Sequence, residues 1–397
     1  MRFTAQRAEL LNAAKAASRI IPVNTPIDSI KGLLFSANAE KGIVEVTGTD
    51  IRTRITKRVP ITGNPQSGDF VIGAVIKDIL NLMNGETVTF DDSFTGMINI
   101  SCNHTVYELP YMQAKEFPAS SMTFPDTFVT VNDLNKLIKK SSFATEKNVT
   151  SPTVKQNLHI MLRPGESFSE ATDGNRLIYA KSEGVCDGEL SLFLHNSAIN
   201  VLSSLLSGNQ TMYAGVSNQY AVFFNSDTIV STMMMNGSLP DMNTFISQIT
   251  PDYKAYADTS VLKNALETAL CCQLSGDDSC VNIVFCENTI VIKAQAYKRN
   301  SVISVNAVCN TPTDDAGFNY NPRYILDFLN LCSGDISLTA NTKGFLLIED
   351  KSCRYLVSPR GPVSIHIPQE KAKSDTKETA KKTTAKKQTK KSVKKAA

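Results

Sequence analysis

Apolar residues recur every three or four positions in three stretches that lie far apart in the chain. In the first stretch Leu10, Leu11 and Ala14 fall on one side of a helix, while Lys15 and Arg19 fall on another. This spacing predicts amphipathic helices at residues 8–20, 131–145 and 259–272.

A second apolar helical stretch follows in each part of the chain and ends in a glycine-containing polar turn before a strand. These helices are predicted at residues 72–83, 197–206 and 322–331. The turn glycines Gly85, Gly208 and Gly334 are 123 and 126 positions apart. Such a period is too long for a solenoid and suits a whole domain, so the pattern predicts three homologous domains.

A strand ending also repeats with this period. Gly48-Thr49-Asp50 recurs 123 residues later as Ala171-Thr172-Asp173, and more faintly as Ala294-Gln295-Ala296. Because several landmarks keep one register, repetition is a better explanation than chance.

Short β-rich or alternating runs follow the helices, as is typical of antiparallel sheet. They include residues 43–47, 97–100, 220–224, 281–285, 289–292 and 345–348. Two helices on one face of such a sheet predict an α+β fold in each unit. The expected domains are residues 1–122, 123–250 and 251–368, followed by a tail at 369–397.

Composition narrows the class of protein. Hydrophobic residues make up 42% and charged residues 20% of the 397 positions, which is ordinary for a soluble domain protein. No apolar run approaches the roughly 20 residues of a bilayer span, and no signal peptide opens the chain. We therefore expect a cytoplasmic protein with no membrane partner.

Cysteine and histidine give no sign of a disulfide framework, a metal site or a cofactor. The nine cysteines are an odd number without a C-x-x-C, and the four histidines lack ligand spacing. We expect reduced, mostly buried thiols, and no metal.

The net charge of +3 hides an asymmetry. Residues 370–397 carry eleven lysines and three acidic residues, a net +8, which leaves about −5 on residues 1–369. This tail lacks the apolar residues needed for a core, so it is expected to be disordered. A lysine-rich tail suits attraction to phosphate without sequence preference, while a purely solubilising role is the alternative.

Catalytic motifs are missing from the sequence. It contains no G-x-x-x-x-G-K-[ST], G-x-G-x-x-G, H-E-x-x-H or G-x-S-x-G. Acidic pairs occur at Asp91-Asp92, Asp277-Asp278 and Asp314-Asp315, each in turn-like sequence. A surface turn is favoured over metal-dependent phosphoryl chemistry, so the protein is predicted not to be an enzyme.

Several segments resemble the bacterial DNA polymerase III β sliding clamp family, in order and over roughly residues 1–367. They are Met1 to Thr4, Gly48 to Asp50, Ala171 to Leu177, Asn321 to Leu329 and Tyr355 to Pro359. The most specific is the A-T-D-G-x-R-L segment at residues 171–177.

The resemblance implies a ring of six similar domains, made by two three-domain chains joined head to tail as a homodimer. Closure removes both unmatched edges of an open array. The edge strand from His104 to Leu109 would meet the region around Leu270 to Cys272. The implied interface residues are His104, Val106, Leu270, Cys271 and Cys272.

The helices of such a ring would line the hole and present basic side chains to double-stranded DNA without reading its sequence. The expected DNA-facing residues are Arg7, Lys15, Arg19, Lys77, Lys136, Lys139, Lys140, Lys263 and Arg323.

The resemblance also implies an apolar pocket between the second and third domains that receives short linear motifs from the replicative polymerase and the clamp loader. The matched positions are Leu158, Thr172, Gly174, Arg176, Leu177, Pro240, Phe245, Phe345, Leu356, Ser358 and Pro359. Arg176 is expected to orient the bound peptide.

The chain departs from the family at its C-terminal strand. Ser358 stands where a thioether usually lines the pocket, and the chain continues past Arg360 into the basic tail. Two other functions stay open: a nucleoid-type protein that binds DNA through its tail, and a nucleic-acid enzyme that uses an acidic pair.

Overall fold

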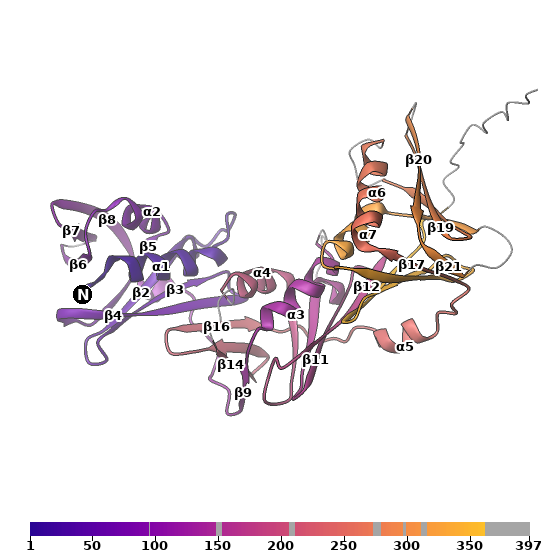
Figure 1. Ribbon diagram of the computed structural model, residues 1–397. Helices are drawn as coiled ribbons and strands as arrows, with labels where there is room; N and C mark the ends of the chain where they lie inside the picture. The colour runs from indigo at the N-terminus through magenta and orange to yellow at the C-terminus, as the bar shows by residue number, and fades with distance from the viewer. Residues whose placement is uncertain are drawn as a thin grey trace, which may run out of the picture. The chain divides into compact units, whose positions relative to one another are not determined.

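The computed structural model describes residues 1–94, 96–147, 153–205, 211–272, 279–296, 299–310 and 316–361 (Figure 1). Within these ranges no helix combines the length and the apolar character that crossing a bilayer requires. The chain divides into two units, residues 1–365 and 366–397, and the described residues all belong to the first.

Strands of the described residues form three antiparallel sheets. The first has the order β1-β6-β7-β8-β5-β2-β3-β4-β16-β15-β14-β9. Its strands are β1 (Arg2–Gln6), β2 (Gly32–Asn38), β3 (Ile43–Thr49), β4 (Thr53–Gln66), β5 (Gly68–Gly73), β6 (Thr87–Phe94), β7 (Met97–Cys102), β8 (Thr105–Gln113), β9 (Phe128–Val131), β14 (Met212–Ser217), β15 (Tyr220–Phe224) and β16 (Thr228–Met233).

The second sheet has the order β13-β10-β11-β12-β25-β24-β23-β17-β21, and the third the order β20-β19-β18-β22. The second contains β10 (Asn157–Leu162), β11 (Glu166–Thr172), β12 (Arg176–Glu183), β13 (Leu190–His195), β17 (Tyr253–Asp258), β21 (Val308–Asn310), β23 (Asp335–Ala340), β24 (Leu346–Glu349) and β25 (Cys353–Val357). The third contains β18 (Val281–Cys286), β19 (Thr289–Ala296), β20 (Arg299–Asn306) and β22 (Ala316–Tyr320).

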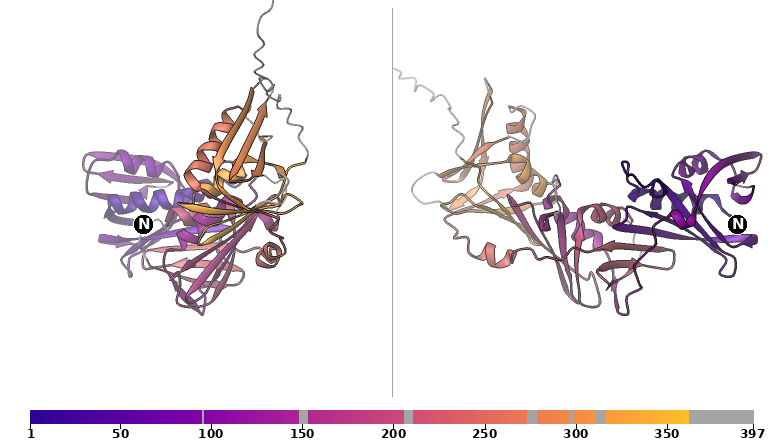
Figure 2. Two further views of the ribbon diagram at one scale, coloured as in Figure 1. Left: turned by 45° about the vertical axis from the view of Figure 1, so that its right-hand side comes forward. Right: turned by 180° about the vertical axis from the view of Figure 1, so that it is seen from behind.

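The sheets join segments that are far apart in sequence. β4 pairs with β16, and β12 pairs with β25, so strands from one third of the chain continue into a sheet of the next. Figure 2 shows the ribbon from two further sides. We call these the first joint (β4–β16) and the second joint (β12–β25).

Helices pack in pairs within each third of the chain: α1 with α2, α3 with α4, and α6 with α7 (Figure 1). Their bounds are α1 (Arg7–Ala17), α2 (Ile76–Leu82), α3 (Leu134–Ser141), α4 (Asn196–Leu205), α5 (Met242–Ser247), α6 (Thr259–Cys271) and α7 (Pro322–Leu329). Short 3₁₀ turns occur at Ser18–Ile20, Asp28–Lys31, Ala114–Glu116, Ser142–Ala144 and Val154–Gln156.

Two of the predicted helices begin later than the periodicity indicated. Ile72 belongs to β5 and pairs with Leu33, and α2 begins only at Ile76. Val131 belongs to β9, where it pairs with Met212. In both places a buried strand precedes the helix, and its apolar residues extend the helical pattern by coincidence.

The glycine turns have a structural role in the two copies that the structure describes. The strand after the turn pairs with the strand that leads into the first helix, as β6 does with β1 and β23 does with β17. The Arg7 N–H donates to the Glu86 carbonyl at 2.8 Å, and the Thr259 N–H donates to the Gly334 carbonyl at 2.9 Å. The copy at Gly208 lies outside the described residues.

The core of the first third is built around stacked phenylalanines. The Phe3 and Phe90 rings lie 4.9 Å apart, and Phe35 lies 5.5 Å from both Phe70 and Phe90. These side chains are almost fully buried, and they fix α1 against the strands beneath it.

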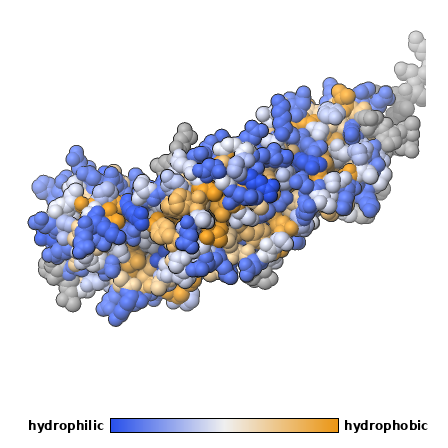
Figure 3. Space-filling view, turned by 90° about the horizontal axis from the view of Figure 1, so that it is seen from below, coloured by the Kyte–Doolittle hydropathy of each residue, from blue (hydrophilic) through white to orange (hydrophobic). Residues whose placement is uncertain are grey.

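Part of the sheet surface remains apolar. Phe124, Phe128 and Tyr213 are 51%, 54% and 38% exposed, and their rings contact one another or Phe224. They lie on or next to β9 and β14, and Figure 3 shows apolar surface on the face that is seen from below.

Candidate functional site

A tight turn between β11 and β12 builds the site. The Thr172 hydroxyl donates to the Arg176 carbonyl at 2.7 Å and accepts from the Gly174 N–H at 3.0 Å, while Asp173 Oδ1 accepts from the Arg176 N–H. Gly174 has φ +94°, and a Cβ there would lie 2.6 Å from Lys155 Nζ. The residue types Thr-Asp-Gly therefore suit this turn, which places Arg176 at the start of β12.

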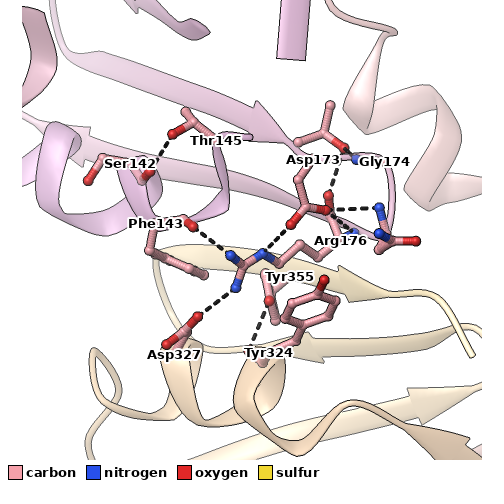
Figure 4. Close-up of polar contacts among 11 residues, drawn as sticks. Ser142, Phe143, Thr145, Asp173, Gly174, Arg176, Tyr324, Asp327 and Tyr355 are labelled. Carbon is pink, nitrogen blue, oxygen red and sulfur yellow. Dashed lines mark hydrogen bonds and ion pairs between the residues drawn. The ribbon is translucent and has the colours of Figure 1, made fainter. Parts of the chain in front are cut away.

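The Arg176 guanidinium connects the second third of the chain to the last (Figure 4). It donates to Asp173 Oδ2 at 2.8 Å, to Asp327 Oδ2 of α7 at 2.6 Å and to the Phe143 carbonyl at 2.8 Å. The Tyr324 ring centroid lies 4.4 Å from the guanidinium carbon. Only 8% of the Arg176 side chain and 13% of the Asp173 side chain are exposed, whereas Asp327 is 44% exposed, so the guanidinium is shielded from water and the Asp327 end of the network is not.

Burial alone would lower the pKa of Arg176, but the surrounding groups outweigh it. Tyr355 and the carboxylates of Asp327 and Asp173 raise the pKa above its ordinary value. Burial in turn raises the pKa of Tyr355. The guanidinium is thus charged at all physiological pH values and is held in one position by its own chain.

An open pocket of about 700 Å³ lies beside this network at the second joint; we call it the joint pocket. Its lining residues are Val154, Lys155, Thr172, Gly174, Arg176, Leu177, Ser238, Leu239, Pro240, Phe245, Phe345, Leu356 and Ser358. The structure therefore brings together nine of the eleven positions that the sequence placed in a partner pocket.

The other two positions lie elsewhere. Leu158 is fully buried in the core, because β10 alternates and turns Leu158, Ile160 and Leu162 inward. Pro359 lies against Gly344, just beyond the lining. Sequence reasoning missed four lining residues, Val154, Lys155, Ser238 and Leu239, although all of them lie close to predicted residues in sequence.

The walls of the joint pocket are mainly apolar. Leu177 and Leu356 belong to a small hydrophobic cluster with Tyr179, and the rings of Phe245 and Phe345 meet edge to face at 6.3 Å. Phe245 remains 43% exposed. Such a pocket can take an apolar side chain from outside, and Lys155 and Arg176 supply positive charge at its edge.

Two of the basic residues expected to face DNA, Arg7 and Lys140, donate hydrogen bonds to backbone carbonyls. Arg7 donates to the carbonyls of Gly85 at 2.7 Å and Leu80 at 2.9 Å, and Lys140 donates to the Lys181 carbonyl at 2.7 Å. These contacts fix α1 and α3 to neighbouring turns and strands.

The other expected DNA-facing residues lie on or beside the paired helices. Lys139 and Arg323 are exposed on α3 and α7, and Lys77 is half-buried on α2. The remaining side chains have single polar partners: Lys15 with Asn81, Arg19 with Ser204, Lys136 with Asp133 and Lys263 with Glu267.

The residues expected at a subunit interface lie in two places, around the start of β8 and at the end of α6. Val106 of β8 is 60% exposed, and His104 is exposed in the turn before that strand. Leu270 and Cys272 are half-buried and Cys271 is exposed at the end of α6. Sequence reasoning missed β20, which packs beside α6 and is an edge strand of the third sheet.

Of the three acidic pairs, the structure describes only Asp91-Asp92. Asp91 pairs with Arg2 at 3.6 Å, and Asp92 pairs with the N-terminal amino group. The pairs at 277–278 and 314–315 lie outside the described residues. Among the residues that the structure does describe, no cluster of three or more His, Cys, Asp or Glu could hold a metal ion.

Sequence comparisons relate this chain to known proteins. The family model for the DNA polymerase III beta subunit, N-terminal domain, matches residues 1–121. A beta sliding clamp of Rickettsia felis is 19% identical over 363 residues, which cover 85% of this chain and 92% of that protein.

Solved structures share the fold over most of the chain. The DNA polymerase sliding clamp of Bacillus subtilis has a TM-score of 0.83 at 19% identity, and the DNA polymerase III subunit beta of Pseudomonas aeruginosa 0.82 at 16%. Each comparison covers 91% of this chain and 100% of the other. The chain thus has the fold of the beta sliding clamps, and its residues 1–121 match the family of the DNA polymerase III beta subunit, N-terminal domain.

Proposed function

We propose that this protein is a sliding clamp: two chains join head to tail into a ring that encircles duplex DNA and tethers a replicative polymerase. Each chain supplies three repeated domains, at residues 1–122, 123–250 and 251–368, and so half of a six-domain ring. The clamp works by topology and carries out no catalytic step of its own. Its place of action is the cytoplasm, at the DNA.

The main support for a ring is a strand pairing that occurs in two of the three repeats and has no counterpart in the third within the described residues. β4 and β12 each follow a copy of the strand-end landmark, and β20 follows the fainter third copy, Ala294-Gln295-Ala296. β4 pairs with β16, the last strand of the second third, and β12 pairs with β25, the last strand of the final third. β20 pairs with β19 alone among the described strands.

The first third supplies the strand that would complete this pattern. β8 is its last strand, and Thr105–Pro110 pair only with β7 among the described strands. The proposed interface therefore adds β8 of one chain to β20 of the other, as a third joint. Val106, 60% exposed, and Val302, 52% exposed, would lie in this interface and lose their contact with water.

The exposed basic side chains of the paired helices are the proposed contacts to DNA. Lys139 and Arg323, with Lys15 and Arg19, can approach phosphates without reading bases. Retention comes from ring closure, so each phosphate contact can be weak.

The joint pocket is the proposed docking site for short apolar motifs of the polymerase and the clamp loader. Arg176 shapes the pocket wall from within its own network, and Leu177 supplies apolar surface. We expect Leu177→Ala to weaken binding of a polymerase-derived peptide while the dimer stays intact by sedimentation. Unchanged affinity would count against the pocket.

The ring is tested by loading the protein onto nicked circular DNA and then cutting the circle once. A topological clamp stays on the circle and runs off the free ends after cutting, also when residues 370–397 are deleted. The tail, with its eleven lysines, supports the competing nucleoid-type function. That function predicts that binding survives linearisation and disappears with the tail.

A further inference from the structure

A second cavity, of about 420 Å³, lies on the other side of the segment that borders the joint pocket; we call it the linker cavity. Its lining residues are His159, Phe168, Glu170, Ser191, Phe193, Gly237, Ser238, Leu239, Pro240, Asp241 and Asn243. Ser238, Leu239 and Pro240 line both cavities, so one three-residue wall separates them.

The strand alternation of the second sheet explains which side chains face the linker cavity. Leu158 and Ile160 of β10 point into the core, so His159 between them points to the opposite face. His159 lies directly across from Glu170 of β11 and from Phe193 of β13.

A hydrogen-bonded row crosses the floor of the cavity. His159 Nδ1 lies 3.0 Å from Glu170 Oε2, and its Nε2 lies 3.2 Å from the Ser191 hydroxyl oxygen. The rings of Phe168 and Phe193 lie 5.9 and 6.3 Å from the imidazole. The row fixes the Glu170 carboxylate beside an imidazole that contacts both aromatic rings.

This carboxylate keeps an acceptor for a ligand. The Glu170 side chain is only 10% exposed, and within the described part of the chain its Oε1 accepts no hydrogen bond. Oε1 is not one of the fully buried polar atoms that lack a partner, so it remains accessible and can accept from a donor that enters the cavity. A charged donor would make a charge-assisted hydrogen bond there, which is stronger than a neutral one.

The charge of the lining favours a cation. Asp241 is the second carboxylate, and hydrogen bonds from Thr244 lower its pKa, so it is ionised at neutral pH. Of the residues that line the cavity, only His159 can carry a positive charge. The nearby Arg163, 5.7 Å from the Phe168 ring, is paired with Glu189 at 3.2 Å.

We propose that the linker cavity binds a lysine or arginine side chain of the same partner segment whose apolar residue occupies the joint pocket. The aliphatic stem lies between Phe168 and Phe193, and the ammonium or guanidinium group donates to Glu170 Oε1. A peptide that crosses the Ser238–Pro240 wall reaches both cavities at once. The inference rests on the proposed docking role of the joint pocket.

The test uses acetylated, amidated peptides that contain Leu-Phe and one lysine placed one to five residues before it, each matched by a norleucine peptide. At the best spacing, we expect the lysine peptide to bind the full chain about five- to tenfold more tightly. Glu170→Gln should remove this preference, because it keeps the shape and loses the charge. Glu166→Gln, an exposed carboxylate on the same strand, is the matched control and should keep it.

The two proposals fail differently. If Leu177→Ala leaves the affinity of the norleucine peptides unchanged, the docking role of the joint pocket fails. If Leu177→Ala weakens them but lysine gives no advantage at any spacing, or the advantage survives Glu170→Gln, the linker cavity is not a cation site.

A small probe tests the cavity without any peptide. n-Butylammonium should shift the ring ¹⁵N resonances of His159 in the wild-type chain and not in Glu170→Gln, while n-butanol should shift neither. Equal shifts in the two proteins, or none in the wild type, would overturn the proposal.

Discussion

The first and second joints have equivalent hydrogen bonds in their turns, and they differ in the side chains that occupy the space beside those turns. At the first, the Thr49 hydroxyl donates to the Thr53 carbonyl at 2.9 Å and the Thr53 N–H donates to Asp50. At the second, Thr172 and Arg176 make the equivalent bond at 2.7 Å.

The pairing strands match as closely. The Met233 N–H donates to the Arg52 carbonyl at the first joint, and the Ser358 N–H donates to the Asn175 carbonyl at the second, both at 2.9 Å. Thr53 therefore corresponds to Arg176, and Met233 corresponds to Ser358.

The side chains at these positions decide whether a joint is filled or hollow. Thr53 and Thr232 are 1% exposed and their hydroxyl oxygens lie 3.0 Å apart, so the first joint is closed. At the second joint the Arg176 side chain reaches Asp327, and Ser358 lines an open pocket. A repeated backbone thus acquires a binding site through a few side chains.

Removing the Arg176 guanidinium should give the largest difference in stability between the two joints. Arg176→Ala leaves Asp173 with no guanidinium partner in a buried position, and we expect a loss of about 2–3 kcal/mol in the free energy of unfolding. Thr53→Ala, its counterpart at the first joint, should cost about 1 kcal/mol. Urea denaturation of both variants measures the difference, and equal losses would contradict our account.

Restoring the side chain of the first joint should sharpen the comparison. Met233 occupies at the first joint the position that Ser358 occupies at the second. Ser358→Met therefore gives both joints a methionine there, and it adds apolar surface to the pocket. We expect a Leu-Phe peptide to bind about fivefold more tightly, measured by calorimetry. Ser352→Met, outside the pocket, should leave the affinity unchanged.

The turns themselves differ in strain. Ile51 has φ +81° where Gly174 has φ +94°, and it is 53% exposed. Left-handed backbone is costly for a β-branched residue, so Ile51→Gly should stabilise the protein by about 0.5–1 kcal/mol after the entropy of glycine is subtracted. Thermal unfolding would show it, and a lower melting temperature would contradict the equivalence of the turns.

The smallest effect concerns acid stability at the first joint. Burial alone would raise the pKa of Asp227, but hydrogen bonds from Lys57 and Thr228 outweigh it and lower the pKa. A lowered folded-state pKa gives stability above the unfolded value, near 4, that is lost as the pH falls further. Because Asp227 is 47% exposed, the loss between pH 5 and pH 2 should be well under 1 kcal/mol and absent in Asp227→Asn.

The sequence predicts residues of the joint pocket well because most of them lie in contiguous motif segments. It does not reveal that Asp327 holds Arg176, since that contact depends on how α7 packs against β25, the strand that pairs with β12. Leu158 is different: the alternation of β10 already indicated a core residue.

Basic residues on the helices show another limit. Arg7 and Lys140 have the spacing of exposed side chains, yet both donate to backbone carbonyls. Spacing tells which side of a helix a residue occupies, but not whether a turn from elsewhere ends within reach of its charge.

The hydrogen-bonded ladders across the joints also have a mechanical consequence. β4 and β16 are bonded over five residue pairs, and β12 and β25 over five more. A bending force on either joint would load these bonds in parallel, so several must break together before the joint yields. Each of these two joints should therefore resist bending as a unit, because its hydrogen bonds share the load.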